Sequence, residues 1–576
     1  MQLWSSLCIM IEAGAISARP VMAPFWLVAW SVTLSTAWLL PNHYLPWTGF
    51  HFDLWVACVL SMASATVILR SPGTTHWHAS AAFAGVLVLV PSLQQAVGMM
   101  VFSGNTWVCS AYLLALLLVL LTGAKWESTS PGQLADGLFL AIGLAAISSV
   151  GLQLHQWLRF DSLDVWIMAD NFGRPFANFG QPNQLATFLL WGLLALAWGL
   201  VRRHITCASA LFVAAYLLFG LALTRSRTAW LAAILLVVVV WVWRRHWSTP
   251  RVPFVVTGLA LYFALCVASL GSLHQALLLA EHKDLLDPTR MSTETRPTIW
   301  LMFLNAALER PWLGYGWNQV ALAQVNVALD HPGLNSTFSQ AHNLFLDLIL
   351  WCGIPSGLIV SFGLLRWSWL RFRAVRNAED AILVLFLLVV ANHAMFELPL
   401  HYAYMLLPVG LVAGALNVRL GAGPLLRTGR WPMMAIWVVS LVLLAVIVRD
   451  YSRVEPTYRQ LRFEWANIKG PPVEPPDVLV LTQLREYVRL AKFEPKSEMS
   501  EAELEWMRGV AGIYPGAGPF QKMATALALN GRTDEARLWL QRLCKITPEI
   551  QCALAKRVWH RMSEQDSRIA SVPWPK

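Results

Sequence analysis

Long apolar runs alternate with short polar segments over roughly the first 450 residues of this 576-residue chain. About 20 apolar residues allow an α-helix to cross the hydrocarbon core of a bilayer. The pattern therefore predicts an all-α polytopic membrane protein with about thirteen transmembrane helices. We expect these helices near residues 23–40, 52–70, 79–98, 107–123, 134–152, 184–200, 207–223, 228–243, 252–270, 342–364, 381–397, 403–418 and 433–448. The first run follows Arg19 without a small-residue cleavage site, so we expect it to be a retained anchor.

Composition and charge agree with this pattern. Of all residues, 57% are hydrophobic and only 13% are charged. Three connecting segments, 41–51, 99–106 and 393–402, contain no Lys or Arg, whereas the segments between them are rich in arginine. The positive-inside rule places the arginine-rich set in the cytoplasm. The net charge of +10 reflects this bias, and we expect a lipid bilayer and no nucleic acid as partner.

From about residue 450 the composition becomes that of a soluble segment. We therefore divide the chain into a transmembrane domain, 1–449, and a helical domain, 450–576, which thirteen spans place outside. Two helices are predicted at Phe520–Leu529 and Asp534–Lys545. Their small residues and leucines are spaced as in a tetratricopeptide-type hairpin, although a small helical domain of another kind also explains them.

Cysteine and histidine patterns give a disulfide candidate and no metal site. Cys544 and Cys552 flank Pro548 in the external domain, where oxidation is possible. No CxxC, HExxH or clustered His and Asp set is present, so we expect neither a metal nor a cofactor.

Arg225 and Arg227 occupy a four-residue gap between two apolar runs. An arginine at the centre of a membrane helix costs about 2.5–3.5 kcal/mol on insertion scales, so its presence needs a reason. The predicted topology places this gap outside, against the positive-inside trend. Binding of an anion such as phosphate would explain both arginines. The alternative is that they anchor the helix ends at the membrane interface, with their side chains reaching to water.

The long external segment 271–341 and its end carry two more candidates. Arg296 begins a predicted helix, and a helix N-terminus itself favours anions. The alternative for Arg296 is an ordinary ion pair with Glu294. His342 begins a predicted span and can accept a proton from a hydroxyl group, unless it is merely a capping or core histidine.

Two further segments on the same face concentrate polar side chains. Arg174, Gln181 and Asn183 precede a predicted span and can bind anions or sugar hydroxyls, although a turn with a helix cap is the alternative. Glu397 and Tyr402 lie in the next such segment. Glu397 is suited to orient an arginine or histidine, and Tyr402 to bond a phosphate or sugar. An interfacial aromatic belt is the alternative there.

At these residues the chain resembles the PglL-type protein O-oligosaccharyltransferases, also called pilin glycosylation ligases, of the O-antigen ligase and polymerase (Wzy_C) superfamily. The resemblance rests on RPFANFGQPNQLA from Arg174, LTRSRTA from Leu223, RPTIWLMFLNAALERPWLGYGW from Arg296, AHNLFLDLILWCG from Ala341 and ELPLHYAYMLLP from Glu397.

This resemblance implies a GT-C-like membrane fold with a large periplasmic loop, in the bacterial inner membrane. It implies en bloc transfer of a preassembled glycan from undecaprenyl pyrophosphate to Ser or Thr of periplasmic or pilin proteins. His342, Gln181 and a tyrosine, for which we choose Tyr402 over Tyr404, are implied to be required. Three arginines are implied to hold the pyrophosphate, namely Arg225, Arg227 and Arg296.

Other functions remain open at this point. The topology also suits a transporter or a lipid-linked glycan flippase, but polar groups gather at one face and no internal repeat is evident. Ligation of O-antigen to lipid A-core and glycan polymerisation use the same kind of donor. The C-terminal domain alone could serve to recruit an acceptor.

Overall fold

The computed structural model describes residues 20–279 and 296–575, apart from 72, 161, 164, 170–173 and 248. The segment 271–341, which the sequence predicts to be external, is thus described only in part, and Glu294 and residues 171–173 lie outside the described residues. The elements are α2 (Pro24–Ser35), η1 (Thr36–Leu39), α3 (Phe50–Arg70), β1 (Thr75–Trp77), α4 (Ala79–Ala96), α5 (Ser103–Thr129), α6 (Gln133–Trp157), α7 (Pro182–Val201), α8 (Cys207–Leu223), α9 (Arg227–Val242), α10 (Val252–Ala276), α12 (Arg296–Glu309), α13 (Val320–Val327), α14 (Leu344–Cys352), α15 (Ile354–Arg373), α16 (Ala378–Ala394), η2 (Pro399–His401), α17 (Ala403–Arg419), β2 (Leu426–Thr428), α18 (Arg430–Trp465), α19 (Thr482–Lys492), α20 (Glu501–Ile513), α21 (Ala517–Leu529), α22 (Thr533–Ile546), α23 (Glu549–Gln565) and α24 (Ser567–Ala570).

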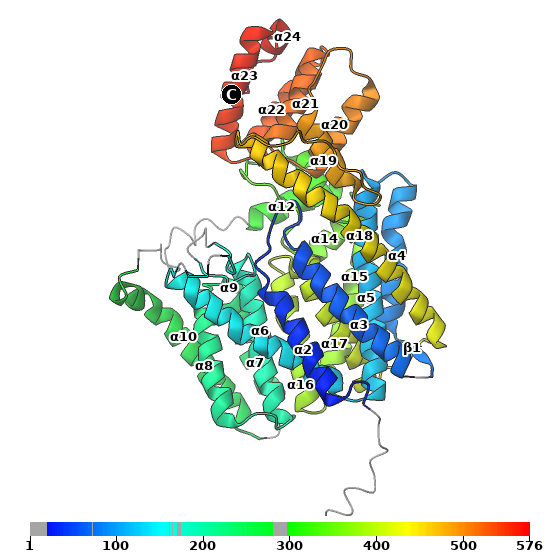
Figure 1. Cartoon of the computed structure of the whole chain (residues 1–576), viewed down its shortest axis with the longest axis vertical. Helices are drawn as coiled ribbons and strands as arrows, with labels where there is room; N and C mark the ends of the chain where they lie inside the picture. The colour runs from blue at the N-terminus through cyan, green and yellow to red at the C-terminus, as the bar shows by residue number, and fades with distance from the viewer. Residues whose placement is uncertain are drawn as a thin grey trace, which may run out of the picture.

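The described chain is mostly helical (Figure 1), which confirms the helical part of the prediction. Within the described ranges, seven helices are long and apolar enough to cross a membrane, namely α3, α4, α5, α6, α7, α10 and α18. Three shorter apolar helices, α8, α9 and α17, accompany them. The chain is therefore a polytopic membrane protein, while the count of thirteen spans stays a prediction. A small antiparallel pairing of β1 with β2 departs from the all-α expectation.

The predicted single helix at 342–364 is broken at Gly353 into α14 and α15. Gly353 has a φ of 82°, and a Cβ there would lie 2.2 Å from the Trp312 carbonyl oxygen. The segment after α12 enters this break, because Ile354 N–H donates to the Pro311 carbonyl at 2.7 Å. Glycine permits both the left-handed conformation and the close approach. An apolar run long enough for one span is thus divided by a neighbouring loop.

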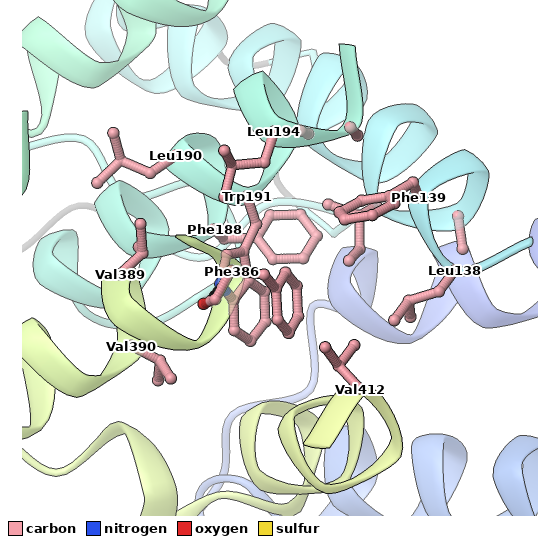
Figure 2. Close-up of a cluster of buried hydrophobic side chains, with 14 of the residues drawn as sticks. Leu138, Phe139, Phe188, Leu190, Trp191, Leu194, Phe386, Val389, Val390 and Val412 are labelled. Atoms are coloured by element: carbon pink, nitrogen blue, oxygen red, sulfur yellow. Dashed lines mark hydrogen bonds between the residues drawn. The ribbon is translucent and has the colours of Figure 1, made fainter. Parts of the chain in front are cut away.

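A core of aromatic side chains fixes α6, α7 and α16 against one another (Figure 2). The rings of Trp191 on α7 and Phe386 on α16 stack at 4.1 Å, and Trp191 Nε1 donates to the Phe386 carbonyl at 2.9 Å. Phe139 on α6 packs edge-on against Phe386. Offset aromatic pairs add to the free energy gained by burial. This core fixes the middle of α7 against the middle of α16.

Helices α19 to α24 gather at one end of the molecule, and α18 leads to them along α3 and α5 (Figure 1). The two helices predicted from the sequence are confirmed as α21 and α22. Helix α18 passes residue 450 without a break, so the change of composition there does not coincide with the end of a helix. The buried core of these helices also includes Val325 and Ala328, from the segment around α13.

Candidate active site around Glu397

Four of the predicted residues converge on one buried carboxylate. Glu397, which is 9% exposed, lies between α16 and η2. Its Oε1 accepts hydrogen bonds from Asn183 Nδ2 at 3.2 Å and from the Arg296 guanidinium at 3.2 Å. Its Oε2 accepts from Gln181 Nε2 at 3.1 Å and lies 3.4 Å from Nδ1 of His342. Segments far apart in the sequence thus supply one cluster.

Helix starts place three of these side chains. Gln181 is the N-cap residue of α7 and is followed by Pro182, whose fixed φ favours the first helical turn. Asn183 lies in that first turn, so its expected place at a helix start is confirmed, but its side chain bonds Glu397. Arg296 is the first described residue of α12.

The segment before α14 holds His342 from both sides. Asn343 caps α14, since its Oδ1 accepts from the N–H groups of Phe345 and Leu346. On the other side, Ala341 N–H donates to Asp347 Oδ1 at 2.7 Å. His342 itself has a φ of 56°, which is uncommon for a residue with a Cβ. A backbone held in this conformation by its neighbours fits a site that fixes one ring orientation.

Arg174 approaches the same cluster from another segment. Arg174 Nε donates to the Thr224 carbonyl at 3.0 Å, and its NH2 lies 3.5 Å from Asn183 Oδ1. Arg174 therefore connects the cluster to the residue before Arg225. Arg225 is 7% exposed and has a φ of 49°. Arg227 differs, because it begins α9 with an exposed side chain.

Tyr402 and Tyr404 have different surroundings. Tyr404 is 1% exposed, its hydroxyl donates to Gln184 Oε1, and its N–H donates to Asp53. Tyr402 is only partly buried. Burial raises the pKa of Tyr402, and the charges of Asp53 and Glu397 raise it further. Tyr404 is thus a core residue, while Tyr402 is partly buried and close enough to Glu397 for that charge to contribute to its raised pKa.

The surroundings of Glu397 keep it ionised. Burial alone raises the pKa of this carboxyl group, but contact with His342, the nearby His393 and the hydrogen bond from Gln181 outweigh it. The net effect lowers the pKa of Glu397 to about 2. A carboxylate fixed in this way can orient an imidazole and stabilise its protonated form.

Two contributors were missed by sequence reasoning. Asp347 holds the backbone before His342, and its position inside the apolar run LFLDLILWC was a usable signal, since a charge in such a run needs a reason. The ring centroid of Phe396 lies 5.8 Å from the Arg296 guanidinium carbon, in a cation–π contact that no sequence spacing reveals. In the part of the chain that the structure describes, no group of three or more His, Cys, Asp or Glu is placed to hold a metal.

Comparison with known proteins gives matches over most of the chain. Residues 212–361 match the family model described as O-antigen ligase, and residues 175–198 match protein glycosylation ligase. Residues 381–561 match the C-terminal part of a virulence factor membrane-bound polymerase. A general O-oligosaccharyltransferase of Acinetobacter baylyi is 29% identical over 552 residues, which cover 91% of this chain and 93% of the relative. A ComP-specific O-oligosaccharyltransferase of the same organism is 30% identical over 43% of this chain and 44% of its own length.

The chain is therefore an enzyme of the glycosyltransferase class. Its resemblance to the PglL-type protein O-oligosaccharyltransferases of the O-antigen ligase superfamily is confirmed.

Proposed function

We propose that this enzyme transfers a preassembled glycan en bloc from undecaprenyl pyrophosphate to Ser or Thr hydroxyls of periplasmic or pilin proteins. The observation that carries this proposal is the placement of His342 beside the ionised Glu397, with Gln181, Asn183 and Arg296 on the same carboxylate. This arrangement offers a base with a fixed orientation next to donors for phosphate and sugar oxygens.

In the proposed reaction the acceptor hydroxyl oxygen attacks the anomeric carbon of the glycan, and the bond from that carbon to the pyrophosphate oxygen breaks. His342 takes the hydroxyl proton on Nε2, because Nδ1 faces Glu397. Glu397 then stabilises the imidazolium, as a carboxylate does in other His–carboxylate pairs. A single displacement of this kind inverts the anomeric configuration.

The departing undecaprenyl pyrophosphate needs positive charge, and we assign this role to Arg174, Arg225, Arg227 and Arg296. Arg174 connects Asn183 to the Thr224 carbonyl, which directly precedes Arg225. Arg296 contacts Glu397, as Asn183 does. We therefore group Arg174, Arg225 and Arg296 at the Glu397 cluster. Arginine remains charged at all relevant pH values and matches phosphate oxygens with two donors. The displacement as proposed uses these cations in place of a metal ion. We assign to Tyr402 and Gln181 hydrogen bonds with oxygens of the lipid-linked glycan.

The proposed setting is the bacterial inner membrane, with about thirteen spans in a GT-C-like arrangement. Under this proposal the active site, the loop around 271–341 and the helices after residue 450 face the periplasm. This orientation brings the site to the compartment that contains both the flipped lipid-linked glycan and pilin-type acceptors. The cluster of arginines outside then has a function that offsets its departure from the positive-inside rule.

The test is intact-protein mass spectrometry of a pilin-type acceptor from cells that make an undecaprenyl-pyrophosphate-linked glycan, with and without this chain. We expect a mass increase of one glycan that requires this chain and is abolished in His342→Ala. His204→Ala is the matched control, because His204 also lies 3.4 Å from a carboxylate, that of Asp136, but follows the end of α7 opposite to Gln181. Full transfer by His342→Ala would remove this histidine from the mechanism.

The O-antigen ligase match over residues 212–361 supports a second candidate, in which lipid A-core is the acceptor. The same cells distinguish the two, because glycan would then appear on lipid A-core while the acceptor protein keeps its unmodified mass.

A further inference from the structure

Lys545, in the last turn of α22, holds a loop that lies more than two hundred residues earlier in the chain. Its Nζ donates to the carbonyl oxygens of Leu329 at 2.6 Å and His331 at 2.7 Å. Its own carbonyl accepts from the N–H groups of Leu334 and Asn335, both at 3.1 Å. One residue of the C-terminal helices thus makes four hydrogen bonds to the backbone between 329 and 335.

The same helices also fix α13, which precedes this loop. Arg542 Nε donates to the Val325 carbonyl at 3.1 Å, in the last turn of α13. Val325 and Ala328 are 4% exposed and belong to the buried core that includes Leu543. The contact therefore has an apolar part and a hydrogen-bonded part, as a permanent interface has.

From α13 the contacts continue to the proposed base. Gln324 Nε2 donates to the Ser336 carbonyl at 2.8 Å, and its Oε1 accepts from Phe338 N–H at 2.8 Å. The ring of Phe338 meets the ring of His342 edge to face at 5.7 Å. A continuous series of contacts thus leads from Lys545 to His342.

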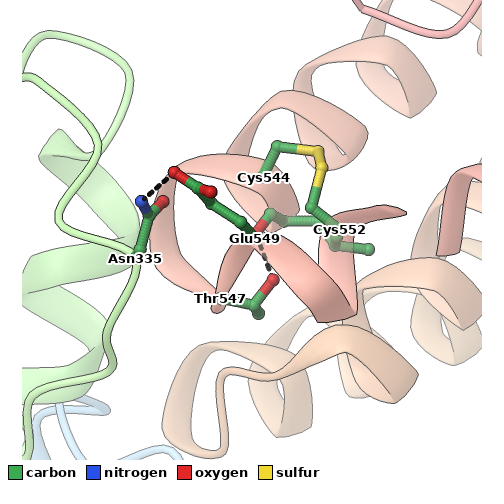
Figure 3. Close-up of a disulfide and its surroundings, with 6 residues drawn as sticks. Asn335, Cys544, Thr547, Glu549 and Cys552 are labelled. Carbon is green, nitrogen blue, oxygen red and sulfur yellow. Dashed lines mark hydrogen bonds between the residues drawn. A yellow bond between two sulfur atoms is a disulfide. The ribbon is translucent and has the colours of Figure 1, made fainter. Parts of the chain in front are cut away.

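The disulfide between Cys544 and Cys552 lies directly beside Lys545 and joins the end of α22 to α23 (Figure 3). Next to it, Asn335 Nδ2 donates to Glu549 Oε1 at 3.5 Å, so α23 also touches the loop (Figure 3). The cross-link limits how far the end of α22 and the start of α23 can separate. It therefore helps to keep Lys545 and Glu549 in contact with the loop 329–335.

We propose that Lys545 is a positioning residue for the transfer reaction. By this inference the C-terminal helices form part of the support of the catalytic segment, because they fix the loop that ends at His342. This goes beyond a role in recruiting an acceptor, and it rests on the proposed function of His342.

The test compares Lys545→Met with Lys522→Met in the full-length enzyme. Lys522 is a matched control, because its Nζ also donates to two backbone carbonyls, those of Ala491 and Phe493, but within the C-terminal helices. The rate of transfer is measured with an undecaprenyl-pyrophosphate-linked oligosaccharide while the concentration of a pilin-type acceptor is varied. Lys545→Arg, which keeps two donors for the two carbonyls, is the conservative variant.

We expect Lys545→Met to lower kcat roughly ten- to a hundredfold with the KM for the acceptor unchanged, since a misplacement of about 1 Å can cost about 100-fold. Lys545→Arg should recover much of kcat, and Lys522→Met should match the unmodified enzyme. A raised acceptor KM with unchanged kcat would overturn the proposal and assign these helices to recruitment. Equal losses in Lys545→Met and Lys522→Met would also overturn it, since they indicate general destabilisation. If the unmodified enzyme transfers nothing to the acceptor, the proposed function itself fails.

Discussion

Glu397 is the residue on which the stability of the site and its chemistry both depend. Its carboxylate contacts Gln181, Asn183, Arg296 and His342, and it is largely shielded from solvent. Removal of one charge from a buried network leaves the remaining charges unpaired, and this lowers the free energy of unfolding. The pH dependence of stability therefore reports directly on this carboxylate.

We expect Glu397→Gln to lower stability near neutral pH, by an amount of the order of 3 kcal/mol, because one pKa unit corresponds to about 1.4 kcal/mol. The folded pKa of about 2 lies below the ordinary value of 4.5. The contribution of Glu397 is thus complete above about pH 4.5 and is lost as the pH falls towards 2. Thermal unfolding in detergent should show the two proteins converging over this interval.

Glu455→Gln serves as the control for that experiment. The Glu455 carboxylate also lies 3.4 Å from a histidine, but its side chain is 28% exposed, so solvent weakens the pairing. A constant difference between Glu397→Gln and the unmodified protein from pH 7 to pH 2 would contradict the assigned role.

At the level of helices, α5 and α17 pack closely against each other at two glycines. A Cβ on Gly123 of α5 would lie 2.0 Å from the Leu411 carbonyl oxygen, and one on Gly414 of α17 would lie 2.2 Å from the Leu120 carbonyl oxygen. Small residues allow membrane helices to approach in this way. Helix α17 begins directly after the segment of Glu397 and Tyr402, so this packing also fixes the site.

Gly123→Ala should therefore separate α5 from α17 and destabilise the protein by about 1–3 kcal/mol, the usual cost of overpacking. Gly363→Ala on α15 is the control, because nothing lies within 4 Å of a Cβ there. The unfolding midpoint in detergent should fall for Gly123→Ala and stay constant or rise for Gly363→Ala. An equal midpoint in both variants would show that the helices adjust without cost.

Over the whole molecule, the sequence predicts most helices and candidate residues but not their connections. Hydrophobic periodicity located α7 and α16, yet the meeting of Gln181 with Glu397 depends on the aromatic contact between Trp191 and Phe386. The break at Gly353 could not be predicted, because its cause is a loop forty residues earlier in the chain. Local patterns report local structure, whereas these features arise from tertiary packing.

The join between the membrane region and the C-terminal helices depends on Asp450, a fully buried residue within α18. Its Oδ2 accepts from the N–H groups of Leu479, Val480 and Leu481, at 2.8, 2.6 and 3.1 Å. One carboxylate thus fixes the start of the chain segment that leads into α19. Unpaired buried donors cost about 1–3 kcal/mol each, so the side chain is hard to replace.

We expect Asp450→Ala to loosen the C-terminal helices from α18 without unfolding the membrane region. Amide hydrogen exchange should rise at residues 479–484 and at the loop 329–335, because Lys545 is carried by the same group of helices. Asp477→Ala is the control, since the Asp477 side chain is 78% exposed and surface ion pairs contribute about 0–1 kcal/mol. Faster exchange at 479–484 with an unchanged loop would show that the loop is held independently of α18. Faster exchange at both would place the membrane helix, the C-terminal helices and the segment of His342 in one mechanically connected unit.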